Sequence, residues 1–403
     1  MTKETGNHVV VIENEQQAKE EMAAVKASAP GIACMAGKAQ FHCLKIKNVS
    51  CRGANILKQE MLARGGEAAV SIDAVYAQGQ TDVLLMGTKL QLVRLAEKLD
   101  CQPFLGLQDI AQNIRDILQG MEKQSFSLAL PGGRTLELSP KHTQIMGIVN
   151  VTPDSFSDGG FYFKPEKAVE QAVKLHEEGA DIIDLGAVSS RPGADLADED
   201  EEWKRLEPVI KALVKEDILL SIDTFRASVA RRALDAGAHI INDIGGFHMD
   251  AGLAETVAEY GCPVVMMHNR MQIFADKPYT DFLSDVIQDL EISRNMGLEA
   301  GVKPEQIIVD PGVGFGKTPA QNRLLIRQLG IFRGMGHPIL LGVSRKSFIA
   351  DTLPELEPLQ RDDATMALGV VGALQGAHIL RVHEVLRTKQ IMKIVDEVRN
   401  ERG

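Results

Sequence analysis

The chain has 403 residues, of which 44% are hydrophobic and 25% charged, which excludes a disordered chain, a collagen and a disulfide scaffold. Lys and Arg number 44 against 55 Asp and Glu, so the formal net charge is −11, the opposite sign from that of a non-specific nucleic-acid or anionic-membrane binder. The length exceeds one average domain and favours one large unit or two unequal ones.

The five cysteines form no C-x-x-C pair and match no zinc spacing, so we expect reduced thiols and a cytoplasmic location. The first residues, MTKETGNHVVVIENEQQ, are polar and carry no signal-peptide core, and no apolar run reaches the roughly 18 residues of a membrane span.

The pattern of residues 1–122 predicts a small α/β or α+β domain of unknown function. Short apolar runs alternate there with helical segments; the runs lie at 9–12, 41–46, 68–72 and 83–86, and the helical segments at 54–63, 89–99 and 110–121. Residues 123–142 predict a linker and a β-hairpin, because apolar alternation flanks Pro131-Gly132-Gly133, whose glycines tolerate positive φ.

From residue 143 to 403 the pattern becomes a regular alternation of strands and helices. Strands are predicted at 144–152, 182–186, 218–224, 239–244, 263–268, 307–312, 338–344 and 379–383. Helices are predicted at 165–178, 200–215, 227–236, 251–260, 281–300, 320–328, 362–375 and 384–398. Eight such units in about 250 residues indicate a (β/α)8 TIM barrel. A doubly wound sheet would normally carry a G-x-G-x-x-G after its first strand, and none is present.

Polar residues gather at the carboxyl ends of these otherwise apolar strands. They are Asn150, Asp223, Asn242, Asp243, His268, Asp310, Ser344, Arg345, Lys346, Arg381 and His383. Because active sites of barrels lie at this end, we expect them to surround one ligand-binding mouth.

The chemistry of this set indicates the ligand. Asp223, Asn242 and Asp310 could accept from a heterocycle rich in N–H donors. Four other residues could donate hydrogen bonds to phosphate oxygens or to an electron-rich ring atom: Arg191, Lys346, Arg381 and His383. Asn150 could help to hold Mg²⁺, and the residues alone therefore suggest a small heterocycle bearing a phosphate or diphosphate.

Seven blocks spread from about Thr143 to the C-terminus resemble those of the dihydropteroate synthase family. They are IMGIVNVTPDSFSDGG, LGAVSSRPGAD, SIDTFRASVA, INDIGG, DPGVGFGKT, GVSRKSF and ILRVHEV. The resemblance implies condensation of a 7,8-dihydropterin-6-ylmethyl diphosphate with p-aminobenzoate, giving 7,8-dihydropteroate and diphosphate. It also implies a homodimer and a Mg²⁺ cofactor.

The resemblance further implies roles for individual residues. Pterin would be held by Asp223, Asn242, Asp310 and Lys346, and the diphosphate by Asn150, Arg191, Arg381 and His383, with Asn150 also at the metal. The p-aminobenzoate site would comprise Phe156, Ser190, Arg191, Pro192, Phe315, Lys346 and Ser347. Lys346, Arg381, His383 and Asp223 would carry catalysis, and loops 152–160 and 187–195 would close over the substrates.

The chain departs from the family pattern in two blocks. The second block usually reads G-G-E-S-T-R-P, and here residues 186–192 read GAVSSRP, so Val188 stands where the family usually has a glutamate while Ser190 keeps a hydroxyl. In the last block, Glu384 stands where an aspartate is common.

Some features keep more than one interpretation. A Walker A loop at 312–318 is ruled out, because the motif needs a glycine where this chain has Pro311. His268 is more simply explained as a hydrogen-bonded structural residue than as a metal ligand. Lys317 can be a solvated loop lysine. Asp184 can be either a site residue or a satisfied inward carboxylate. Alternative functions are a pterin-dependent methyltransferase acting with a corrinoid partner and a non-catalytic pterin-binding protein.

Overall fold

The computed structural model describes residues 6–151, 165–188 and 198–401. The chain divides into two compact units, Met1–Glu122 with Gly334–Gly336, and Lys123–Arg333 with His337–Gly403. Each unit has its own apolar core.

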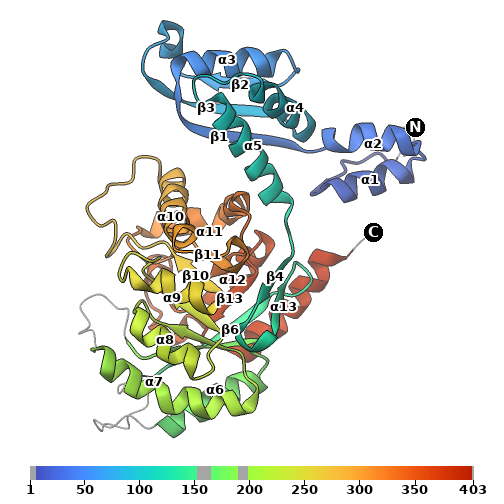
Figure 1. The fold of residues 1–403 in the computed structure, drawn as a ribbon. Helices are drawn as coiled ribbons and strands as arrows, with labels where there is room; N and C mark the ends of the chain where they lie inside the picture. Colours follow the sequence, from blue (N-terminus) through green and yellow to red (C-terminus); the bar gives the residue numbers. More distant parts are fainter. Residues whose placement is uncertain (1–5, 152–164, 189–197, 402–403) are drawn as a thin grey trace. The chain divides into compact units, whose positions relative to one another are not determined.

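The first unit is an antiparallel sheet with helices packed on one face (Figure 1). Strands β1 (Phe41–Ser50), β2 (Glu67–Val70) and β3 (Gln80–Thr88) lie in the order β1-β3-β2. Alternate residues such as Leu44, Ile46 and Leu85 point into the core and meet the helices, as a half-buried strand requires. The helices are α3 (Cys51–Leu62), α4 (Lys89–Asp100) and α5 (Leu107–Glu122).

The start of this unit differs from the expectation. The apolar run 9–12 forms no strand, and Val9, Val10 and Val11 are exposed. Two helices that the sequence did not predict follow it, α1 (Glu15–Ala24) and α2 (Ala29–Met35). They bury only Ala18 between them, so neither carries the apolar stripe by which a helix is recognised.

The hairpin of β4 (Phe126–Ala129) and β5 (Thr135–Leu138) belongs to the second unit. Its turn places Gly132 and Gly133 at φ 81° and 82°. Leu128 and Leu136 pack against the first residues of the barrel strands, including Met146 and Ile182. The hairpin therefore fills the amino-terminal end of the barrel.

Eight parallel strands form the barrel, as predicted. They are β6 (Gln144–Asn150), β7 (Ile182–Gly186), β8 (Leu220–Asp223), β9 (Ile240–Asp243), β10 (Val264–Met267), β11 (Ile307–Asp310), β12 (Leu340–Leu341) and β13 (Ile379–Val382). Their order is β11-β10-β9-β8-β7-β6-β13-β12, and a parallel bridge between Val309 and Ile339 joins the two ends.

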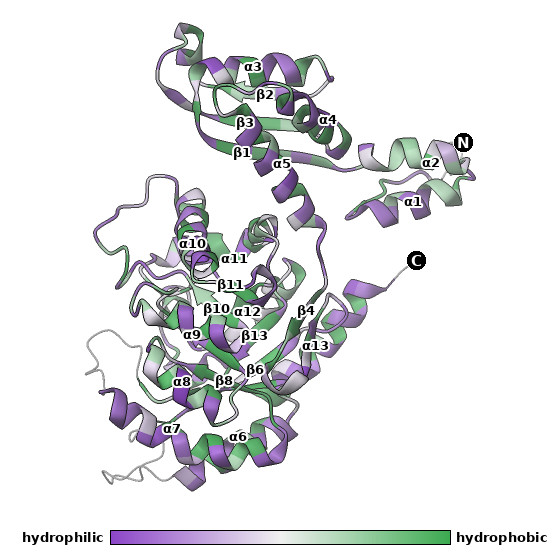
Figure 2. Cartoon of the chain, in the orientation of Figure 1, coloured by the Kyte–Doolittle hydropathy of each residue, from purple (hydrophilic) through white to green (hydrophobic). Residues whose placement is uncertain are grey.

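Helices surround these strands (Figure 1). They are α6 (Pro165–Glu177), α7 (Glu199–Leu213), α8 (Ala227–Asp235), α9 (Gly252–Tyr260), α10 (Phe282–Glu299), α11 (Pro319–Arg327), α12 (Asp362–Leu374) and α13 (Val385–Asn400). Figure 2 shows hydrophobic strands inside a ring of helices with hydrophilic outer turns. Strands enclosed in this way are buried on both faces, which explains their unbroken apolar sequence.

Several strands end earlier than predicted. Asp310 is the last residue of β11, and its Oδ1 accepts the N–H of Gly312 at 2.8 Å, so the chain turns there instead of continuing as a strand to residue 312.

No helix among the described residues is long and apolar enough to cross a membrane. All five cysteines are free.

Candidate active site

Arg381 lies at the centre of the polar residues at the carboxyl ends of the barrel strands. Its Nε donates to Asp184 Oδ2 at 2.7 Å, and its Nη2 donates to Asp223 Oδ2 at 2.8 Å. Asn242 Nδ2 donates to the same oxygen of Asp184 at 3.0 Å. Side chains from β7, β8, β9 and β13 are thus joined in one network, with the fully buried Asp184 as the shared acceptor.

Asp184, whose role the sequence left open, contacts two of the candidate site residues. Asp184 accepts from Nδ2 of Asn242, so it holds that amide with its oxygen turned away from the carboxylate. It also holds Arg381 by one edge of the guanidinium. The second oxygen of Asp184 is buried without a hydrogen-bond partner.

Asp310 and Lys346 meet Arg381 around Gly342. A Cβ on Gly342 would lie 3.9 Å from Arg381 Cβ, from Asp310 Oδ2 and from Lys346 Nζ. Lys346 Nζ donates to the carbonyl of Val313 and lies 4.7 Å from the centroid of the Phe315 ring. The acids and cations predicted for the mouth of the barrel therefore face one another.

Burial shifts the ionisation of this cluster. It raises the pKa of Asp223 to about 7, with Arg381 opposing the shift and Asp184 adding to it. It lowers the pKa of Lys346 to about 8 although Asp310 favours the charged form. Burial also raises the pKa of Asp310. For Arg381, the attraction of Asp184 and Asp223 outweighs burial and raises the pKa.

The other described candidates lie at the carboxyl ends of barrel strands or in the loops that follow them. His383 follows β13, and its Nδ1 is 2.8 Å from the hydroxyl of Ser344, which also accepts the His383 N–H at 3.2 Å. Asn150 ends β6 with an exposed side chain, Phe315 is half-buried, and Ser347 is exposed. Phe156, Ser190, Arg191 and Pro192, with most of loops 152–160 and 187–195, lie outside the described residues.

Three strand-end residues serve other purposes. Asp243 accepts the N–H groups of Gly245 and Phe247 at 2.7 and 2.6 Å and so shapes a turn. Arg345 points to Asp362, with which it forms two hydrogen bonds of 2.7 and 2.8 Å. His268 bonds Asp289 at 3.2 Å, which confirms its structural interpretation.

Lys317 is not the solvated lysine that the sequence allowed. Its ammonium lies 2.8 Å from His268 Nδ1, 2.7 Å from the Gly312 carbonyl and 3.0 Å from the Phe315 carbonyl. Sequence reasoning missed it because the histidine is 49 residues distant along the chain.

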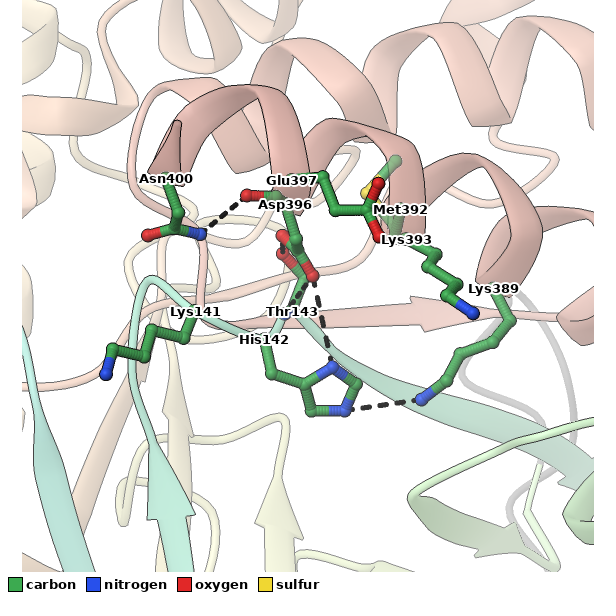
Figure 3. A pocket seen from close by; sticks show the side chains of 9 residues that line it. All are labelled: Lys141, His142, Thr143, Lys389, Met392, Lys393, Asp396, Glu397 and Asn400. Carbon is green, nitrogen blue, oxygen red and sulfur yellow. Dashed lines mark hydrogen bonds and ion pairs between the residues drawn. The ribbon is translucent and has the colours of Figure 1, made fainter. Parts of the chain in front are cut away.

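A pocket of about 620 Å³ lies at the opposite end of the barrel, between the segment entering β6 and the last turns of α13 (Figure 3). Asp396 accepts from the N–H and the hydroxyl of Thr143, both at 2.7 Å, and Lys389 pairs with Asp181 at 2.8 Å. Three of the ionisable residues that line this pocket, His142, Lys389 and Asp396, are paired within the protein, and the acids of the strand ends do not line it.

Comparisons with known proteins agree with this geometry. Residues 146–383 match the model of a family described as pterin binding enzyme. The chain is 45% identical to a dihydropteroate synthase of Bacillus subtilis over 65% of this chain and 90% of the relative. A dihydropteroate synthase structure from Xanthomonas albilineans with 4-aminobenzoic acid has a TM-score of 0.64 and 37% identity, and the match covers 69% of this chain and all of that one.

A relative from Halobacterium salinarum also matches the first unit. It is named "Probable bifunctional folylpolyglutamate synthase/dihydropteroate synthase" and is 37% identical over 96% of this chain, which spans 46% of its length. Together with the family match over most of the barrel, these similarities show that the chain belongs to the pterin-binding enzyme family.

Proposed function

We propose that the protein is a dihydropteroate synthase, which joins a 7,8-dihydropterin-6-ylmethyl diphosphate to p-aminobenzoate and releases diphosphate. The observation that carries this proposal is the meeting of Asp310, Lys346 and Arg381 around Gly342. The relatives of this barrel bear the same name and include one solved with 4-aminobenzoic acid.

The acidic part of the site suits the pterin. Asp310 and the oriented oxygen of Asn242 would accept from the N–H donors of the heterocycle, as charge-assisted hydrogen bonds to a carboxylate favour. Lys346 would donate to an electron-rich atom of the ring. Asp223, with a pKa raised by burial to about 7, would accept from the ring when ionised.

The cationic part suits the leaving group. Arg381 uses Nε and Nη2 for Asp184 and Asp223, which leaves its other N–H groups for the diphosphate, and His383 is held nearby by Ser344. The amine of p-aminobenzoate attacks the pterin methylene, a C–N bond forms, and the C–O bond breaks with its electrons passing to the diphosphate. The new secondary amine then loses one proton to solvent. The neutral amine needs no strong base, so positioning and stabilisation of the departing anion carry the rate.

The proposed cofactor is Mg²⁺, with Asn150 as its protein ligand. No group of three His, Cys, Asp or Glu suited to a metal occurs among the described residues, and Mg²⁺ commonly uses one or two protein groups with water and substrate phosphates. The exposed amide at the end of β6 fits such a role. When bound, the ion would neutralise charge on the leaving diphosphate.

Turnover tests the proposal directly. Full-length protein incubated with the pterin diphosphate, p-aminobenzoate and Mg²⁺ should give 7,8-dihydropteroate and diphosphate in equal amounts, and Asp310→Asn should lose most of this activity. Pterin binding without diphosphate release would refute the synthase and favour a methyltransferase or a binding protein.

The assembly and location are further proposals. Apolar side chains exposed on α12 and α13 support a homodimer; they are Val371, Leu374, Leu386, Ile394 and Val398. Sedimentation should give a dimer that Ile394→Glu weakens. Five free thiols support a reducing, cytoplasmic location, which cell fractionation would test.

A further inference from the structure

The loop between β11 and α11, residues 312–317, packs tightly against the segment that follows β10. Gly312 has φ 68°, and a Cβ there would lie 1.8 Å from the His268 carbonyl oxygen. A Cβ on Gly316 would lie 2.5 Å from the carbonyl carbon of Arg270. Only glycine permits this approach, so the position of the loop depends on what holds it there.

Lys317 closes this loop on itself and ties it to the segment that follows β10. Its Nζ reaches the carbonyl of Gly312 at the start of the loop, the carbonyl of Phe315 further along it, and the ring of His268. These are three acceptors for the three N–H bonds of an ammonium group. Burial lowers the pKa of Lys317 well below its usual value, and the charge of Asp310 opposes that shift.

The neighbours of His268 fix the direction of these hydrogen bonds. Asp289 Oδ2 accepts from Arg270 Nε at 2.7 Å and lies 3.2 Å from His268 Nε2. Burial opposes ionisation of Asp289, but the bonds from His268 and Arg270 prevail and lower its pKa. An ionised carboxylate can only accept, so Nε2 carries the imidazole proton and Nδ1 accepts from Lys317. Burial lowers the pKa of His268 to about 4, in keeping with a neutral ring.

The loop carries groups that face the substrates. Its Gly312 N–H donates to Asp310 Oδ1 at 2.8 Å, its Val313 carbonyl accepts from Lys346 Nζ, and its Phe315 ring lies under the same ammonium. A shift of the loop would move partners of both Asp310 and Lys346.

We propose that Lys317 is a positioning residue which, braced by His268, holds loop 312–317 in the place where it orients Lys346 and Phe315 toward the substrates. This inference rests on the proposed synthase function. Neither side chain needs to touch a substrate for this role.

Lys317→Met tests the brace, because it keeps the length of the side chain and removes the charge. We expect kcat/KM for p-aminobenzoate to fall about 10- to 100-fold, the effect of losing hydrogen bonds to a charged group. The alkaline limb of the pH profile should also move upward, because the Lys317 charge that repels Lys346 is lost and water admitted around Lys346 relieves the burial that lowers its pKa to about 8. The other charged groups facing Lys346 remain in place: Asp310, Arg381 and Asp223.

Tyr279→Phe is the matched control. The ring lies 4.1 Å from the Arg270 guanidinium in the same cluster, and its buried hydroxyl has no hydrogen-bond partner. This variant should keep the wild-type KM and pH profile. A folded Lys317→Met protein with both unchanged would overturn the brace.

A pair of histidine variants covers the case in which Lys317→Met fails to fold. The amide of His268→Gln can accept from Lys317 and donate to Asp289, whereas His268→Leu can do neither. The Gln variant should be closer to the wild type than the Leu variant in KM for p-aminobenzoate and in the alkaline limb, and equal behaviour of the two would contradict the proposal.

Hydrogen exchange separates the brace from the proposed function. The N–H of Gly314 donates to Asn322 and that of Phe315 to Gly312, so a released loop should exchange faster in a peptide covering 312–317. Faster exchange in Lys317→Met but not in Tyr279→Phe supports the brace even if the wild type proves inactive as a synthase. Unchanged exchange would refute it.

Discussion

Arg381→Ala should damage turnover more than folding. The substitution removes the cation between Asp184 and Asp223, whose side chains are 0% and 16% exposed. It also removes the donor proposed for the leaving diphosphate. The two effects can be measured separately on one purified protein.

The folding penalty is limited by the ionisation of Asp223. Removing one partner of a buried ion pair costs about 3–5 kcal/mol when the other stays charged. The pKa of Asp223 is already about 7 with Arg381 present, so without that cation the carboxyl takes up a proton near neutral pH. We therefore expect a loss of about 2 kcal/mol in the free energy of unfolding at pH 7, below the full penalty.

The pH dependence of this loss of stability follows from the raised pKa of Asp223. A carboxyl whose pKa is raised in the folded state binds its proton more tightly there than in the unfolded chain, so stability falls as pH rises toward the folded pKa. The variant should consequently lose more stability, relative to the wild type, at pH 8 than at pH 6.

Catalysis should suffer more, because a preorganised donor to developing negative charge contributes about 10²- to 10³-fold to kcat. Diphosphate release measures kcat, and urea unfolding measures stability. Arg399→Ala is the matched control, since it removes an arginine from a half-buried pair with Asp396 at the other end of the barrel. It should lose stability and keep kcat. Wild-type kcat in Arg381→Ala would refute the proposed role.

Three further outcomes are expected. The pH profile of kcat/KM should be a narrow bell, because activity is lost below about pH 7 as Asp223 is protonated and above about pH 8 as Lys346 is neutralised. A flat profile from about pH 6 to 9 would contradict these assignments. Asp396→Ala should lower the unfolding free energy by about 3 kcal/mol in urea melts without changing KM, because it leaves the buried N–H of Thr143 without its acceptor and removes the carboxylate that pairs with Arg399. Residues 123–403 should fold and retain activity without 1–122, since each unit has its own core, and an aggregated product would count against this boundary.

The barrel could be predicted from sequence because its pattern is local. Each strand is a short apolar run between helices with clear starts, and all eight strands and all eight following helices are present. The helices α1 and α2 could not be predicted in the same way, because almost none of their residues are buried. The rule that polar strand ends face a ligand was too broad, as Asp243 and Arg345 show by turning to partners outside the cluster.

The supporting residues of the site depend on contacts that the linear pattern does not reveal. Asp184 lies within an ordinary strand, and its partner Arg381 is 197 residues further along the chain. Lys317 resembles any loop lysine until His268 is placed beside it. Which buried charge meets which partner is decided by strand order and loop path, and only the fold supplies these.

The most direct test of the central claim is a crystal structure of the protein with a non-reactive pterin diphosphate analogue. The heterocycle should hydrogen-bond Asp310 and Asn242 while the diphosphate contacts Arg381 and His383 in the same cavity. A pterin bound away from Asp310, or a diphosphate directed away from Arg381, would contradict it.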